Sequence, residues 1–230
     1  IACENEANSA FQLAFDSYAK RRLARKGQDL RCQERNQHEA YLGSCSGDIA
    51  TEDFASASDT VALAAVATLF DPDWYRYLSG IRSGLGRLPD GSVLKYEKFS
   101  SMGNGSTFTI ETLIFAACAY AVGSRAFQIY GDDVTLETEY SVPFRKLTRF
   151  FGFTINSEKS YNTGLYRESC GKHYVGGEDV TPFFVRSLKR HKPNLCHILN
   201  GLVSRTTVGS QTFRFCQKIY QQLKTEGFKL

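Results

Sequence analysis

Apolar residues recur at helical spacing near the start of the chain. Phe11, Phe15 and Ala19 are each four residues apart. This pattern predicts a helix over residues 8–26, with Gly27 as its stop signal. Comparable patterns and stop signals predict further helices at residues 60–70, from Pro72 onward, and at 107–122, 142–150, 194–203 and 211–224.

Alternation of side chains between two faces predicts a short strand over residues 48–54. Ile49, Thr51 and Asp53 share one face of that strand. Asp53 ends a partly buried face, where an unpaired carboxylate would be costly. The turn residues at 88–92 predict a connection between two short strands. Brief strands are also expected at residues 153–155 and 181–185.

Two short apolar runs flank Gly131 and Asp132. A two-residue connection with glycine first fits a type II′ hairpin turn, which would lift Asp132 and Asp133 to the hairpin tip. Adjacent carboxylates repel each other and favour a bound cation. Mg²⁺ fits, because it takes one or two carboxylates and leaves room for phosphate oxygens. Asp and Gly are also ordinary turn residues, so the hairpin alone leaves a purely structural role open.

Other polar stretches also allow two interpretations. Ser58 or Asp59 could cap the helix predicted at 60–70, and Asp59 could instead be a ligand. The glycine-containing loop at 100–107 leads into a helix N-terminus, a feature that favours anions but also occurs in plain connecting loops. Lys159 is a lone basic residue, and a surface lysine is its simplest interpretation.

Composition constrains these hypotheses only broadly. The 230 residues are 42% hydrophobic, which is enough for one large domain or two small ones. The net charge of +4 favours polyanionic partners only mildly. Five basic residues at the end of the first helix either complement its C-terminal dipole or contact phosphates. They are Lys20, Arg21, Arg22, Arg25 and Lys26.

Cysteine usage and hydropathy argue against two classes of protein, those built on a disulfide framework and those that span a membrane. The seven cysteines are an odd number without a Cys-x-x-Cys pair, which favours a reduced setting over a disulfide framework. Cys170 and His173 could touch a metal, but two ligands do not make a site. No uninterrupted apolar run approaches about 20 residues, so no membrane span is expected. The chain begins at Ile1 and has Met102 as its single methionine, so we expect a piece of a longer protein.

The candidate residues follow a set order along the chain: one carboxylate ends a strand, then come a glycine-containing loop and a helix, and two carboxylates stand at a hairpin tip. Palm-domain polymerases use this order. The chain resembles the RNA-directed RNA polymerases of positive-strand RNA bacteriophages, the levivirus replicases. The stretches that carry the resemblance are residues 50–59, 86–100, 100–108, 130–133, 151–159 and 167–174.

The resemblance implies an α+β fold. It implies a polymerase palm domain, an antiparallel sheet with packed helices, accompanied by partial fingers and the start of a thumb. Residues 1–47 would be a fingers remnant with the basic helix. Residues 48–190 would form the palm, with 71–100 as a fingers-side insertion. Residues 191–230 would begin the helical thumb.

The resemblance also implies template-directed addition of ribonucleotides to an RNA 3′ end. Asp53, Asp132 and Asp133 would hold two Mg²⁺ ions, with Mn²⁺ as an alternative. Lys159 would protonate the leaving pyrophosphate. Many polymerases carry Asn at the position of Glu111. The phage replicases carry Glu there, as this chain does. The residues expected to contact nucleotide, template or product are Asp59, Ser101, Gly103, Asn104, Thr107, Glu111, Tyr130, Arg167 and Lys172.

Two rival functions stay open. A reverse transcriptase shares the palm, but usually places a bulky aromatic where Ala57, Ser58 and Asp59 stand. A catalytically incomplete, RNA-binding palm fragment is the second rival. The resemblance implies RNA template, RNA product and ribonucleoside triphosphates as partners, and no membrane, in the cytoplasm of a bacterial host. Relatives also recruit host translation elongation factors and a ribosomal protein, which makes these candidate partners.

Overall fold

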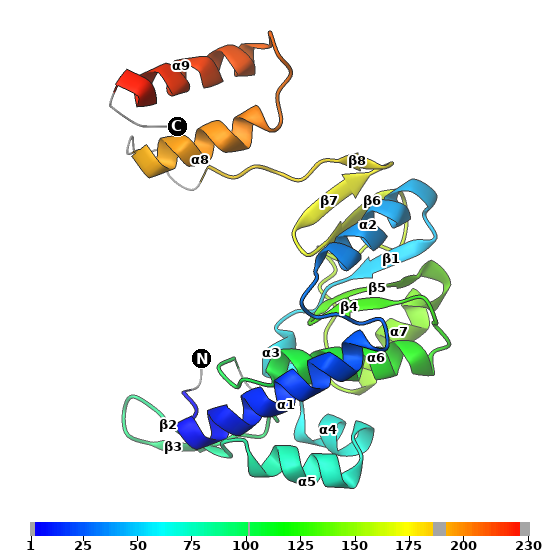
Figure 1. The fold of residues 1–230 in the computed structure, drawn as a ribbon. Coiled ribbons are helices and arrows are strands. Elements are labelled where there is room, and N and C mark those ends of the chain that lie inside the picture. The colour runs from blue at the N-terminus through cyan, green and yellow to red at the C-terminus, as the bar shows by residue number, and fades with distance from the viewer. Residues whose placement is uncertain (1–2, 101, 186–191, 226–230) are drawn as a thin grey trace. The chain divides into compact units, whose positions relative to one another are not determined.

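The computed structural model describes residues 3–100, 102–185 and 192–225, which form helices and small antiparallel sheets (Figure 1). The chain divides into two compact units, residues 1–181 and 182–230. No helix within the described residues is long and apolar enough to cross a membrane. The α+β expectation is therefore confirmed at the level of fold class.

The first unit contains seven helices and eight strands among its described residues. The helices are α1 (Glu6–Ala24), α2 (Glu34–Ser46), α3 (Ala57–Thr60), α4 (Leu63–Leu69), α5 (Pro72–Gly80), α6 (Thr107–Ala121) and α7 (Thr138–Phe150). The strands are β1 (Ile49–Glu52), β2 (Leu85–Arg87), β3 (Val93–Lys95), β4 (Gln128–Tyr130), β5 (Asp133–Glu137), β6 (Tyr166–Ser169), β7 (Lys172–Val175) and β8 (Glu178–Asp179).

The central sheet has the antiparallel order β1–β5–β4. Val134 and Leu136 of β5 join a core formed with Ile110 and Phe115 of α6 and Phe144 of α7. Helix α2 packs against β1 and also against β6 and β7 of a second sheet, ordered β6–β7–β8 (Figure 1). Helices therefore cover the strand that ends just before Asp53, and its residues 50–52 are all buried.

Several predicted elements are confirmed. Helix α1 matches the predicted helix at 8–26, and α6 matches the one at 107–122. Pro72 stands at the first turn of α5, where Asp71 caps the helix. The turn at 88–92 joins β2 to β3. Helix α7 begins at Thr138, earlier than residue 142, and has Pro143 inside it, where the proline lacks the backbone N–H of a regular helix.

Four expectations are wrong. The helix predicted at 60–70 is broken into α3 and α4, because Val61 and Leu63 bond with the backbone at Phe99 and Glu97. Neither Ser58 nor Asp59 is its N-cap, since Ala62 precedes α4. Residues 153–155 form only a bridge between Ile155 and Phe54, and residues 181–185 form no strand.

Helix α2 was not predicted. Its buried positions are Asn36, Ala40, Gly43 and Ser44, which lack the large apolar side chains that reveal helical periodicity. A Cβ at Gly43 would lie 2.7 Å from the Ile49 carbonyl oxygen. Small residues are thus what allow α2 to approach β1 closely.

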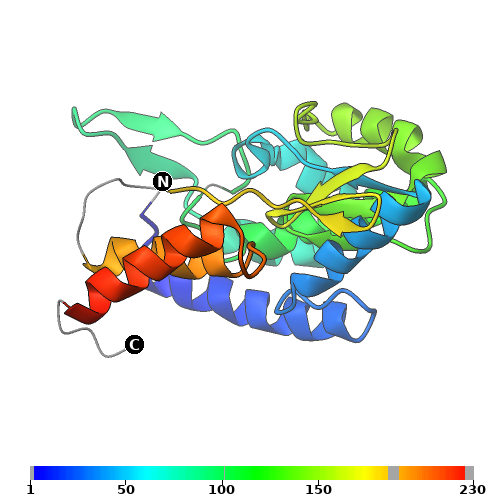
Figure 2. The same ribbon diagram turned by 90° about the horizontal axis from the view of Figure 1, so that it is seen from above.

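The described residues of the second unit form two helices, α8 (Lys192–Val203) and α9 (Gln211–Thr225), which differ from the predicted ranges 194–203 and 211–224 by two residues or fewer at each end. They lie side by side in both views (Figures 1 and 2). Their shared core consists of Leu195, Leu199, Cys216, Ile219 and Leu223. Residues 188–192 include a run of basic residues that we expect to connect two parts of the chain, and most of this run lies outside the described residues.

Candidate active site

The β4–β5 hairpin and the end of β1 bring the predicted carboxylates together. Glu52 pairs with Val134 in the antiparallel register, so Asp53 follows beside Asp133 and the turn. Tyr130 pairs with Asp133, leaving Gly131 and Asp132 as the turn residues. Of these two only Gly131 has a positive φ, +65°, as a type II′ turn requires.

Gly131 is required by space as well as by conformation. A Cβ there would lie 2.3 Å from Cε2 of Phe108, which is in the first turn of α6. The Phe108 ring also meets the Tyr130 ring edge-on, with centroids 4.9 Å apart. The start of α6 thus fixes the position of the turn that carries Asp132.

Electrostatics link Asp53 to the hairpin. Partial burial raises the pKa of both Asp53 and Asp132. Asp132 and Asp133 raise the pKa of Asp53 further, while a hydrogen bond from Asn156 and the charge of Lys159 oppose the rise. The charge of Asp133 likewise raises the pKa of Asp132, and the charge of Lys159 lowers it. A cation would relieve this concentration of negative charge.

Asp133 differs from its neighbours in orientation. It is the first residue of β5 rather than part of the hairpin tip. Its Oδ1 accepts hydrogen bonds from the Ser169 hydroxyl at 3.2 Å and the Cys170 backbone N–H at 3.0 Å. One of its oxygens is therefore committed to the turn between β6 and β7.

The donor chemistry at the site suits Mg²⁺, which takes one or two carboxylates alongside water and phosphate oxygens. Asp53 and Asp132 supply such a pair. Within the described part of the chain, no group of three or more His, Cys, Asp or Glu side chains is arranged to hold a metal ion. Cys170 and His173 are therefore not members of such a group.

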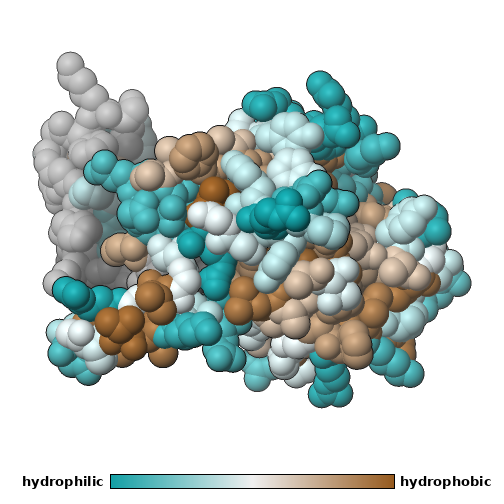
Figure 3. Space-filling view, turned by 90° about the horizontal axis from the view of Figure 1, so that it is seen from below, coloured by the Kyte–Doolittle hydropathy of each residue, from teal (hydrophilic) through white to brown (hydrophobic). Residues whose placement is uncertain are grey.

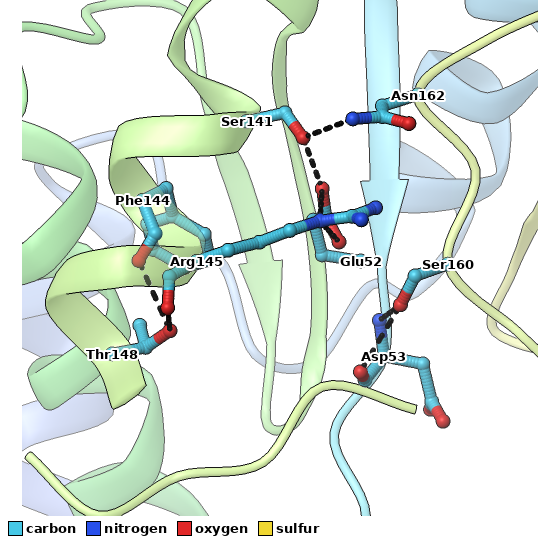
Figure 4. A network of polar contacts seen from close by, with 8 residues as sticks. All are labelled: Glu52, Asp53, Ser141, Phe144, Arg145, Thr148, Ser160 and Asn162. Carbon is cyan, nitrogen blue, oxygen red and sulfur yellow. Dashed lines mark hydrogen bonds and ion pairs between the residues drawn. The ribbon is translucent and has the colours of Figure 1, made fainter. Parts of the chain in front are cut away.

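A segment that we call the strap, residues 154–161, runs antiparallel to the end of β1. Ser160 Oγ accepts from the backbone N–H of Asp53 at 3.0 Å and lies 3.2 Å from its carbonyl (Figure 4). Asn156 donates from Nδ2 to Asp53 Oδ2 at 2.7 Å, and its own N–H donates to the Asp53 carbonyl. Sequence reasoning assigned no role to either residue.

Glu52, directly before Asp53, is fully buried in a polar network (Figure 4). Arg145 of α7 donates from Nε to both carboxylate oxygens, at 3.0 and 2.9 Å. Ser141 donates to Oε1 at 2.6 Å, and Asn162 donates to Ser141. Burial raises the pKa of Glu52, while Arg145 and Ser141 oppose that rise. This network anchors the end of β1 to α7.

Lys159 lies exposed on the strap, in a turn where its N–H donates to the Asn156 carbonyl at 3.1 Å. Its charge lowers the pKa of Asp53 and of Asp132. The predicted proton donor and the two carboxylates therefore share one electrostatic environment.

The glycine-containing loop is held by α1. The fully buried Gln12 accepts from the Gly105 N–H at 2.9 Å and donates to the Ile81 carbonyl at 2.7 Å. The Oδ1 of Asn104 accepts from the backbone and hydroxyl of Ser106, so this side chain organises the loop instead of facing a ligand. The Oδ1 atom of Asn104 is thus already occupied within the loop, and its expected contact with nucleotide stays a prediction.

The remaining loop residues differ in exposure. Gly103 is exposed with φ of +113°, while Thr107 is buried at the first position of α6. Ser101 lies outside the described residues.

Glu111 is an unusual member of the site. Its side chain is buried, and Oε1 has no hydrogen-bond partner. Burial raises the pKa of Glu111 to about 8, helped by the charges of Asp132 and Asp59. Glu111 is thus predominantly protonated at neutral pH, within the negative field of Asp132 and Asp59.

Replacing Glu111 by glutamine is expected to reduce the dependence of stability on pH. Because the pKa is raised in the folded chain above its ordinary 4.5, stability falls as pH rises from about 4.5 to about 8. Keeping Glu111 protonated in the folded chain at pH 7 lowers the free energy of unfolding by about 3 kcal/mol, because the same group is ionised in the unfolded chain. Burying amide hydrogens without acceptors offsets about 1–2 kcal/mol of the gain. The variant should therefore be about 1–2 kcal/mol more stable at pH 7.

Urea unfolding at pH 5 and pH 8, without divalent ions, measures this effect. Glu139→Gln provides the matched control, because Glu139 is exposed on α7. Equal pH dependence in the Glu111 variant and the unsubstituted protein would contradict the expectation.

Asp59 lies in α3 and is ion-paired with Lys98. The antiparallel bridge between Ala62 and Lys98 brings the segment that carries Lys98 beside the chain just after α3. The exposed carboxylate of Asp59 contributes to the negative field at Glu111. Lys98 was not singled out by sequence reasoning.

Arg167 of β6 is hydrogen-bonded to backbone carbonyls. Its side chain is fully buried and donates to the carbonyls of Ile49, Gly47 and Gly164, among others. It therefore ties β6 to the start of β1, and none of its surface is exposed for the predicted contact with RNA. Lys172 remains partly exposed and pairs with Asp179 at 2.8 Å.

The basic end of α1 borders a hollow of about 750 Å³ between α1, α4, α5 and α6. Arg22, Arg25 and Lys26 line it together with aromatic side chains, whereas Lys20 pairs with Asp16. On the side of α4 and α5, hydrophobic and hydrophilic side chains are interspersed (Figure 3). None of the predicted site residues lines this hollow, and both interpretations of the basic run stay open.

Comparison with known proteins shows the family to which the chain belongs. The model of the family described as RNA replicase, beta-chain, matches residues 1–224. The chain is 42% identical to the RNA-directed RNA polymerase subunit beta of Escherichia virus Qbeta, over 90% of this chain and 36% of that protein. It is 36% identical to the RNA-directed RNA polymerase beta chain of Escherichia phage MS2, over 98% and 42% respectively. The chain thus spans less than half the length of these relatives.

Proposed function

Because the chain belongs to the RNA replicase beta-chain family, we propose that it forms the catalytic part of an RNA-directed RNA polymerase. The observation that carries the proposal is the meeting of Asp53 and Asp132, which come from separate elements; the charge of Asp132 raises the pKa of Asp53. The names of the curated relatives support the same activity. The reaction is addition of ribonucleotides to an RNA 3′ end.

We assign the palm to residues 48–190, with 71–100 as a fingers-side insertion. Residues 1–47 are a fingers remnant and 191–230 begin the thumb. The antiparallel sheet with helices packed on it, within residues 48–150, supports the palm assignment.

Asp53 and Asp132 would hold Mg²⁺, or alternatively Mn²⁺, while Asp133 adds negative charge beside them. Bound magnesium supplies activation of the 3′ oxygen and neutralisation of the triphosphate. Lys159 donates a proton to the leaving pyrophosphate, a role worth about 10²–10⁴-fold in rate. Its exposure and its coupling to both carboxylates support that role.

Asp59 is the proposed acceptor for the ribose 2′-hydroxyl, and Glu111 a neutral neighbour on the same side. Small Ala57 and Ser58 leave space that a reverse transcriptase would fill with an aromatic ring. Ser101, Gly103, Thr107 and Tyr130 complete the nucleotide side, and Lys172 is the remaining candidate for the product backbone.

RNA template, RNA product and ribonucleoside triphosphates are the proposed partners. Host translation elongation factors and a ribosomal protein are candidate partners in the cytoplasm of a bacterial host.

Primer extension by the full-length replicase that contains this sequence tests the proposal. We expect incorporation of ribonucleotides on an RNA template, and little synthesis by residues 1–230 alone. A preference for deoxyribonucleotides would instead identify a reverse transcriptase. Folded full-length protein that binds RNA without turnover would support the RNA-binding alternative.

A further inference from the structure

Asn156 uses both ends of its side-chain amide. Its Oδ1 accepts from the Glu158 N–H at 3.3 Å, which shapes the turn that carries Lys159. Its Nδ2 donates to Asp53 Oδ2 at 2.7 Å. Because one end must accept and the other must donate, the orientation of the amide is determined by its partners.

The turn alone does not explain asparagine at this position. Serine or aspartate could also accept from the Glu158 N–H. Serine is too short to reach Asp53 as well, and aspartate would place a second negative charge against it. A short side chain with both an acceptor and a donor is what the two contacts require.

We infer that Asn156 is the positioning residue of Asp53, which commits Oδ2 to the strap and leaves Oδ1 for a divalent cation. The backbone of Asp53 is held by the same strap, through the Asn156 N–H and Ser160. Partners that orient a metal-binding carboxylate typically change metal affinity 10–100-fold when removed. Asn156 also links Asp53 to Lys159, because the Lys159 N–H donates to its carbonyl.

This inference rests on the metal role proposed for Asp53. Its test is the affinity of the full-length replicase for Mn²⁺, measured by electron paramagnetic resonance without RNA or nucleotide. Asn156→Ser keeps an acceptor for the turn but loses the bond to Asp53. Asn156→Ala loses both. Ser157→Ala, on the exposed side of the same turn, is the control.

We expect both Asn156 variants to bind Mn²⁺ about 10–100-fold more weakly, and Ser157→Ala to bind it normally. The Mg²⁺ concentration for half-maximal synthesis should rise in parallel, and excess Mg²⁺ should restore most of the rate. A residue that only forms the turn would instead lower the melting temperature without moving metal affinity.

Asp53→Asn separates this inference from the proposed function. If Asp53→Asn weakens Mn²⁺ binding while either folded Asn156 variant binds as the unsubstituted protein does, the positioning role is overturned alone. If Asp53→Asn itself leaves Mn²⁺ binding unchanged, the metal role of Asp53 fails, and with it the basis of this inference.

Discussion

Asp132→Asn is expected to abolish nucleotide addition by the full-length replicase while leaving the protein folded. The substitution keeps the shape of the side chain but removes the negative charge that would hold a divalent ion. Metal ions supply several kcal/mol of transition-state stabilisation. A loss of that size lowers the rate of the chemical step by about 10³-fold or more. Single-turnover primer extension measures this rate directly.

The stability of this variant provides a second readout. Burial and the charge of Asp133 raise the pKa of Asp132, so its ionised form is disfavoured without a metal. Removing that charge should leave the melting temperature in metal-free buffer unchanged or higher. Asp48→Asn, on the exposed residue before β1, is the control and should retain activity. Near-normal extension by a folded Asp132→Asn protein would contradict the metal-binding role of Asp132.

The parts of this structure that local sequence signals determine were predictable. Gly131 is the only residue type that suits both the positive φ and the contact with Phe108, and its position predicted the hairpin. Apolar spacing likewise predicted α1 and α6, since both present large side chains to the core. The order of the carboxylates along the chain then suggested that Asp53 and Asp132 meet.

Contacts between distant segments were not predictable in the same way. The break between α3 and α4 arises because residues 61–63 pair with residues 97–99, and no local signal announces that pairing. Arg167 has the charge of an RNA-binding residue, yet backbone carbonyls bury it completely. Asn156 is 103 residues from Asp53, and nothing in its own neighbourhood indicates the bond between them.

These distant contacts hold Asp53 from two directions. The strap fixes its carboxylate and backbone, and the Glu52 network fixes the strand that precedes it. Arg145, at the centre of that network, is 93 residues away from Glu52 in sequence. The stability of the first unit should therefore depend strongly on Arg145.

Arg145→Met is expected to destabilise the chain by about 3–5 kcal/mol, because it leaves the buried Glu52 carboxylate without its cation. Methionine keeps most of the apolar stem, so lost packing contributes little. Urea unfolding at pH 7 measures the effect. Arg149→Met, one turn further along α7 and exposed, is the matched control and should change stability by less than about 0.5 kcal/mol.

The dependence of this loss on pH identifies its origin. Burial already raises the pKa of Glu52 above its ordinary 4.5, and removal of Arg145 should raise it further. When folding raises the pKa of a carboxyl group, the protein becomes less stable as pH increases, because the folded chain must then give up a proton that it holds tightly. The difference between the variant and the unsubstituted protein should therefore be smallest near pH 4.5 and grow toward pH 8. A loss of the same size at both pH values would mean that Arg145 stabilises the chain through packing instead of through the charge of Glu52.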